Sequence, residues 1–71
     1  MPELPAGFAD SLARVIEPSD RDAAAEIVEA ATMLDDVGLR RFLRLVAARI
    51  RASAARVRAD ELRELLQRAA L

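Results

Sequence analysis

Apolar residues recur along this chain at the three- and four-residue intervals of amphipathic helices, and prolines and acidic residues separate the runs. The first run shares one helix face and consists of Phe8, Leu12, Val15 and Ile16. We expect a helix over residues 6–17 that ends before Pro18, because the residue before a proline avoids the helical region. Ser19 or Asp20 then provides a cap for a second helix over residues 20–35.

The second predicted helix has an apolar side whose members are Ala23, Ile27, Ala30, Ala31 and Leu34. A third apolar run follows and consists of Leu39, Phe42, Leu43, Val46, Ile50 and Val57. An α-helix turns by about 100° per residue. If the third helix is extended backward with this period, its apolar side falls on Asp35 and not on Leu34. One continuous helix would therefore direct a carboxylate into the core, which favours a break between the two helices.

The break is expected within the sequence LDDVGL. Asp35 or Asp36 would cap a third helix over residues 37–55. Gly38 would ease the turn, or, as the alternative, would lie inside one long kinked helix. A fourth helix is expected over residues 60–70, with acidic residues in its first turn. Its apolar face consists of Leu62, Leu65, Leu66 and Ala69.

No strand signal occurs, so the pattern predicts an all-α fold: a compact bundle of three to four short helices in a single helical domain, residues 1–71. A chain of 71 residues lies near the lower limit for independent folding, because its surface is large relative to its core. Without disulfides or metals such a core supplies only ~3–5 kcal/mol. Since the chain contains no cysteine, we expect dimerisation or a partner chain to complete the bundle.

The composition leaves little for catalysis. With neither Cys nor His, the chain lacks thiolate nucleophiles, imidazole bases and the usual zinc ligands. Asp35 and Asp36 are adjacent, so their side chains diverge by about 100° on a helix and do not form a catalytic pair. Ser11 and Ser53 have no base to activate them. We therefore predict a protein that is not an enzyme and takes no cofactor and no metal.

The sequence contains no targeting or membrane signal. The first residues, MPELPAGFAD, lack the basic region and apolar run of a signal peptide. No segment approaches the ~18 consecutive apolar residues of a membrane span. We expect a cytoplasmic protein, and the use of Arg without Lys together with abundant Ala is typical of a GC-rich, bacterial genome.

Charge is divided unevenly along the chain, although the formal net charge is only -1. Residues 1–36 carry nine acidic residues and two arginines, whereas residues 39–58 carry seven arginines and no acidic residue. On the third predicted helix a basic ridge lies opposite the apolar stripe and consists of Arg40, Arg44, Arg51 and Arg58. On the second, an acidic ridge consists of Asp22, Glu26 and Glu29.

The third helix carries an apolar arc wider than one neighbouring helix covers, which we interpret as a partner interface. Its residues are Leu39, Phe42, Leu43, Leu45, Val46 and Ile50. The chain is therefore predicted to be a non-catalytic protein–protein interaction module, either a homodimer or a small subunit of a larger assembly. Charged residues opposite an apolar stripe are usually solvated; alternatively, the basic ridge meets an acidic surface and sets the orientation of binding.

Nucleic acid is a second possible partner, because arginine suits phosphate contacts. A membrane surface is a third, because LRRFLRLVAARIR has the pattern of a basic amphipathic helix, although its apolar face is needed for the core. The segment AARVRADELREL, residues 54–65, resembles the loop and last helix of small histone-fold proteins, with Val57, Asp60 and Leu62 in the matching places. The resemblance implies a DNA-binding, histone-like or regulatory protein that uses the basic helix 39–58 and has one uninterrupted central helix. Against it, the chain is not basic overall and both phenylalanines lie on core stripes.

Overall fold

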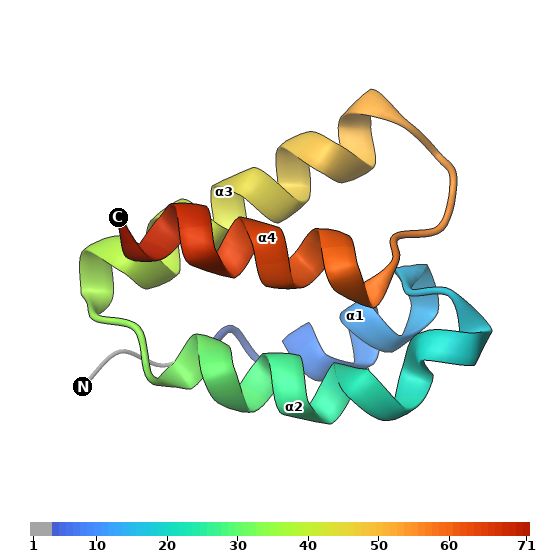
Figure 1. Cartoon of the computed structure of the whole chain (residues 1–71), viewed down its shortest axis with the longest axis horizontal. Helices are drawn as coiled ribbons and strands as arrows, with labels where there is room; N and C mark the ends of the chain where they lie inside the picture. The colour runs from blue at the N-terminus through green and yellow to red at the C-terminus, as the bar shows by residue number, and fades with distance from the viewer. Residues whose placement is uncertain (1–3) are drawn as a thin grey trace.

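Four α-helices surround one apolar core in the computed structural model, which describes residues 4–71 (Figure 1). Their bounds are Phe8–Val15 for α1, Arg21–Thr32 for α2, Asp36–Ala52 for α3 and Ala59–Ala70 for α4, with a 3-10 turn, η1, at Pro18–Asp20. The Cα radius of gyration is 11.1 Å, which matches the ~11 Å expected for a compact domain of this length. The prediction of a compact all-α fold is confirmed.

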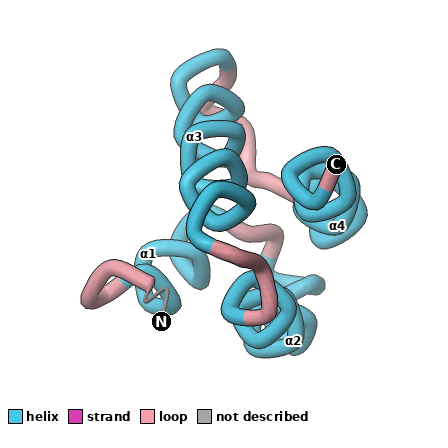
Figure 2. The backbone as a smooth tube through the Cα atoms, turned by 90° about the vertical axis from the view of Figure 1, so that its left-hand side faces the viewer, coloured by secondary structure: helices cyan, strands magenta, loops and turns pink. Residues whose placement is uncertain are grey.

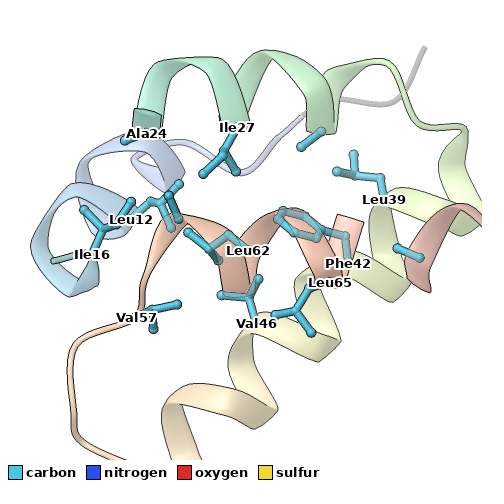
Figure 3. Close-up of a cluster of buried hydrophobic side chains, with 13 residues drawn as sticks. Leu12, Ile16, Ala24, Ile27, Leu39, Phe42, Val46, Val57, Leu62 and Leu65 are labelled. Atoms are coloured by element: carbon cyan, nitrogen blue, oxygen red, sulfur yellow. The ribbon is translucent and has the colours of Figure 1, made fainter. Parts of the chain in front are cut away.

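Helix α4 packs against both α3 and α2, and α2 packs against α1, so that the apolar faces converge (Figures 1 and 2). The large side chains that are fully buried are Phe42, Leu12, Ile16, Ile27, Leu62 and Val57. Figure 3 shows these residues meeting from all four helices and from the loops that follow α1 and α3. The ring of Phe42 meets the ring of Phe8 edge to face, at 6.3 Å between centroids, which connects α3 to α1.

Helix α1 is shorter at both ends than the expected 6–17. Gly7 precedes it with a φ of 80°, a left-handed conformation that only glycine adopts without strain. At the other end Ile16 is extended and forms an isolated parallel bridge with Val57. The Val57 amide donates to the Val15 carbonyl at 2.8 Å, and the Glu17 amide donates to the Val57 carbonyl at 2.8 Å. This bridge closes α1 before Pro18 is reached.

The same bridge corrects the expected end of the third helix. Helix α3 ends at Ala52, not near Ala55, and Val57 is an extended core residue instead of the last member of the α3 stripe. In α2 the inward residues are Ala24, Ile27 and Ala31, whereas Ala30, expected on the same side, is exposed. In α4 the expected residues Leu62, Leu65 and Ala69 are buried.

The predicted break between the second and third helices is confirmed. Helix α2 ends at Thr32 and α3 begins at Asp36. Asp35 is the N-cap: its backbone is extended, and its carboxylate Oδ1 accepts from the Gly38 amide at 2.7 Å. The uninterrupted central helix implied by the histone-fold resemblance is therefore not present in this fold.

Gly38 does not form the turn, contrary to expectation. It lies in the first turn of α3 without a positive φ, and it is buried against α4. A Cβ atom placed on it would lie 3.4 Å from the carbonyl oxygen of Ala69 and 3.1 Å from Oδ1 of Asp35. The tighter of these contacts is with the carboxylate of Asp35, so the missing side chain leaves room for the N-cap hydrogen bond to the Gly38 amide.

Asp20 caps a different helix from the one expected. It occupies the N-cap position of α2 but makes no side-chain cap there. Instead its Oδ2 accepts from the Ala59 amide at 2.9 Å, at the start of α4. The Arg58 guanidinium lies 4.0 Å from the same carboxylate. One aspartate therefore satisfies an orphan amide of α4 and ties that helix to η1.

Replacing Asp35 with alanine is expected to lower the free energy of unfolding by about 1–2 kcal/mol, because the Gly38 amide loses its acceptor. Asp36→Ala is the matched control, since Asp36 is exposed and interacts only with the α3 dipole, an effect of about 0.3 kcal/mol for an exposed charge. Urea unfolding followed by circular dichroism measures both. Equal losses in the two variants would contradict the assignment of Asp35 as the cap.

Candidate interaction surface

The apolar arc predicted on the third helix is divided between the core and the surface. Leu39, Phe42 and Val46 are 4%, 0% and 6% exposed and pack inside the chain. Leu39 and Phe42 therefore offer almost no surface to a partner, whereas Val46 also lines the groove between α1 and α3. Leu43 and Leu45 are half-buried against the core, and Ile50 is 39% exposed. The surface available to a partner is thus narrower than the sequence pattern indicated.

An apolar groove lies between α1 and α3, which occupy the left-hand side of Figure 2. Its volume is about 240 Å³. The residues that line it are Phe8, Ser11, Leu12 and Val15 from α1, with Leu43, Val46, Ala47 and Ile50 from α3. Only one of these side chains is polar. We call this feature the α1–α3 groove.

The contribution of α1 to this groove was not anticipated from the sequence. Phe8 and Val15 were placed on the core stripe of the first helix, and they are only half-buried. Periodicity identifies the apolar side of a helix but does not say how much of that side a neighbour covers. Because α1 is short and packs against α2, its edge toward α3 stays open.

The α1–α3 groove suits an apolar side chain better than a small-molecule ligand. Its volume of about 240 Å³ is below the ~300–1,000 Å³ of typical small-molecule sites. It holds no titratable side chain, and its single hydroxyl, that of Ser11, has no base in a chain without histidine. Shallow apolar grooves between helices are, in contrast, common receptors for one face of a partner helix.

The basic ridge keeps three of its four predicted members. Arg40, Arg44 and Arg51 are exposed on α3, and we call these three the basic rim. Arg58 does not belong to it, because α3 ends at Ala52 and Arg58 is the N-cap residue of α4. Its guanidinium lies 4.0 Å from the carboxylate of Asp20.

Arg41 joins two residues of the basic rim around a shallow hollow. This hollow has a volume of about 250 Å³ and is lined by Val37, Arg40, Arg41 and Arg44. Within residues 4–71, none of the three arginines lies within 4.0 Å of an acidic oxygen. Like charges three and four residues apart on a helix repel each other. This cluster therefore costs stability in the isolated chain, and an anionic partner would offset that cost.

Other arginines are engaged within the chain. Arg49 donates from Nε to Oε2 of Glu61 at 3.0 Å and so connects α3 to α4. Arg63 lies 3.1 Å from Asp60 and 3.9 Å from Glu26. Arg56 donates from Nη1 to the carbonyl of Arg14 at 2.9 Å. These contacts distinguish structural arginines from Arg40 and Arg44, whereas Arg51 of the basic rim donates from Nε to the carbonyl of Ala47 at 3.4 Å.

The acidic ridge is exposed, as expected, and lies on α2. Asp22, Glu26 and Glu29 all face solvent, with Glu26 at 3.9 Å from Arg63. Glu29 borders a shallow hollow between α1 and α2 whose other lining residues are Ala9, Arg21, Ala24, Ala25 and Val28. The apolar members of this hollow are small or half-buried. At its C-terminal end the acidic ridge has one large apolar side chain beside it, that of Met33, which follows Glu29 by four residues and is 83% exposed.

Among the residues that the structure describes, no helix combines the length and the apolar character needed to cross a membrane. In the same part of the chain, no group of three or more acidic side chains converges in a way that could hold a metal ion. Comparisons of the chain with protein-family models, with curated proteins and with solved structures found no match.

Proposed function

We propose that this chain is a non-catalytic protein–protein interaction module that receives an apolar helix face of its partner in the α1–α3 groove. The observation that carries the proposal is the open apolar lining of this groove, with Ile50 39% exposed. Fully burying a side chain of that kind contributes ~1.5–3 kcal/mol. A small domain with a limited core gains stability from such a contact. The partner is a second copy of the chain or another subunit of an assembly.

The polar groups near the groove support binding over catalysis. Ser53, a hydroxyl considered from the sequence, lies beyond the C-terminal end of α3 and accepts from the Ala55 amide at 3.2 Å. This contact gives Ser53 a local structural role. Ser11 lines the groove, where its hydroxyl can hydrogen-bond to a partner.

A designed helical peptide tests the proposal. It carries leucines at positions i, i+3, i+4 and i+7 and glutamines elsewhere, so that its charge does not contribute. We expect the full chain to bind it, and Ile50→Glu to weaken binding by about tenfold or more, because a buried apolar contact is lost and a charge enters the groove. Fluorescence anisotropy of the labelled peptide measures the affinity.

Met33→Glu is the matched control for this measurement. Met33 is 83% exposed and does not line the groove, so the same change of charge should leave peptide affinity unaltered. Circular dichroism of both variants verifies that the helices are retained. Absence of binding to the wild-type chain, or equal binding to wild type and Ile50→Glu, would reject the groove as the receptor.

DNA binding through α3 is the alternative function. It is favoured by one observation, the cluster of Arg40, Arg41 and Arg44 without an acidic partner in residues 4–71. Each phosphate contact would contribute about −0.9 to the slope of log affinity against log salt. Titration of a labelled duplex at several salt concentrations separates the two functions. Steep salt dependence that Arg44→Glu reduces would favour DNA, and an unbound duplex would favour the peptide-binding module.

A further inference from the structure

We infer that the α1–α3 groove receives an acidic amphipathic helix from another protein, and not a second copy of this chain. The inference rests on the proposed function and adds the chemistry of the partner. It follows from the charges that border the groove, from the symmetry of self-association, and from the side chains that accompany the acidic residues of α2.

Arginines border the groove along α3. At about 100° per residue, the groove residues of α3 lie on one arc of the helix, and the basic rim occupies the next arc, about 40° wide. The α3 residues that line the groove are Leu43, Val46, Ala47 and Ile50. Each member of the basic rim is exposed. A helix seated in the groove would therefore run beside three guanidinium groups.

The α1 side of the groove carries both basic and acidic residues. Arg14 is exposed and lies on the side of α1 next to Ser11. Arg56 reaches the same end of α1, where it donates to the Arg14 carbonyl at 2.9 Å. The acidic residues of these two helices are Asp10, one turn before Arg14 on the same side of α1, and Asp36, the first residue of α3. The excess of positive charge beside the groove is therefore on the α3 side, where the basic rim lies.

Self-association through this groove would bring like charges together. A two-fold symmetric contact uses the same patch on both subunits, so the basic rims of both copies would enter one interface whose groove contributes no acidic residue. Juxtaposed like charges oppose association and select against that partner. No acidic residue lines the groove, and none lies within 4.0 Å of the basic rim in the described chain.

The acidic ridge of α2 does not supply the missing occupant. Asp22, Glu26 and Glu29 could pair with the basic rim of another copy. The apolar residues beside them are Ala25 and the half-buried Val28, with the 83% exposed Met33 one turn after Glu29. One large anchor at the end of the ridge does not supply apolar side chains along the length of the groove, which α1 and α3 line over several turns. A suitable occupant combines large apolar side chains at i, i+3 or i+4, and i+7 with Glu or Asp on the flanks. Carboxylates there can accept bidentate hydrogen bonds from arginine.

Three peptides with identical leucine anchors test this inference, and they differ only in flanking residues, which are Glu, Gln or Lys. Anisotropy titrations against the full chain should rank the affinities Glu above Gln above Lys. We expect about a tenfold difference between the Glu and Gln peptides at low salt, because two or more exposed ion pairs form. Added salt should reduce this difference.

Charge reversal on α3 supplies the decisive variant. Arg44→Glu combined with Arg51→Glu should reverse the ranking of the Glu and Lys peptides while the Gln peptide still binds. Arg21→Glu combined with Arg68→Glu is the matched control, because both arginines are exposed and neither lines the groove. The control variant should retain the wild-type ranking. Circular dichroism checks that each variant stays folded.

The outcomes separate this inference from the proposed function. Equal affinity for all three peptides would overturn the acidic partner and leave the module intact. A dimer of the chain alone in light scattering, abolished by Ile50→Glu, would also overturn it in favour of a second copy. Tighter binding of a DNA duplex than of the Glu peptide, lost on the same arginine reversals, would overturn it as well. Failure of every peptide to bind would reject the proposed function itself.

Discussion

Replacing Phe42 with alanine is expected to lower the free energy of unfolding by about 3–5 kcal/mol. Its ring is 0% exposed and contacts the ring of Phe8 at 6.3 Å between centroids. The substitution therefore removes buried apolar area and leaves a cavity between α1 and α3. A domain of 71 residues has a total stability of only about 4–11 kcal/mol. The loss is a large fraction of this, and the variant should be extensively unfolded near body temperature.

Urea unfolding of wild type, Phe42→Ala and Phe42→Leu measures the effect. Phe42→Leu keeps most of the apolar volume, so we expect it to cost less than the alanine variant. Phe8→Ala is a useful comparison, because Phe8 is only half-buried and its removal should destabilise the domain less. A change of under about 1 kcal/mol for Phe42→Ala would contradict its central position in the core.

Ile16→Ala is expected to have the next largest effect, a loss of about 2–5 kcal/mol. Ile16 is 0% exposed and forms the bridge to Val57 that joins the end of α1 to the segment before α4. Removing its side chain weakens the core where these two extended segments meet. The backbone hydrogen bonds of the bridge do not depend on this side chain, so the loss reports packing alone.

Ile50→Ala provides the matched control for Ile16→Ala, since the chemical change is identical. Ile50 is 39% exposed in the groove, and we expect its truncation to cost about 1 kcal/mol or less in the isolated chain. Thermal and urea unfolding give both values. Similar losses at the two positions would mean that Ile50 is buried by another chain or that Ile16 is not in the core.

The unequal behaviour of these two isoleucines illustrates a limit of pattern analysis. Both lie on apolar stripes, and the stripe of the third segment was interpreted as one partner interface. In the folded chain, Leu39, Phe42 and Val46 pack into the core while Ile50 stays open. A helical period identifies which direction is apolar, but the coverage of each position depends on how far its neighbouring helix extends. Helix α1 has 8 residues and α3 has 17, so part of α3 remains uncovered.

The basic ridge shows the same limit for charged residues. Arg58 was assigned to the ridge on the assumption that the third helix continues to that residue. The segment after Ala52 contains no proline or other clear signal that would end a helix. The stop comes from Val57, whose hydrogen bonds with Val15 and Glu17 hold it extended. Such backbone hydrogen bonds between Val57 and a distant segment are not visible in local periodicity. The sequence therefore predicted three of the four ridge residues correctly as neighbours on α3.

The sequence by itself determined an all-α bundle of three to four helices, the end of the first near Pro18, a break at Asp35 or Asp36, and the separation of acidic from basic residues. Proline geometry, capping and periodicity act within a few neighbours, so they are visible in the sequence. Only the tertiary structure decided that Asp20 caps α4 at Ala59 and that Gly38 is buried beside Ala69 of α4. It also decided which apolar residues remain exposed in the groove. These features depend on contacts between segments far apart in the chain, and such contacts form only when all four helices pack together.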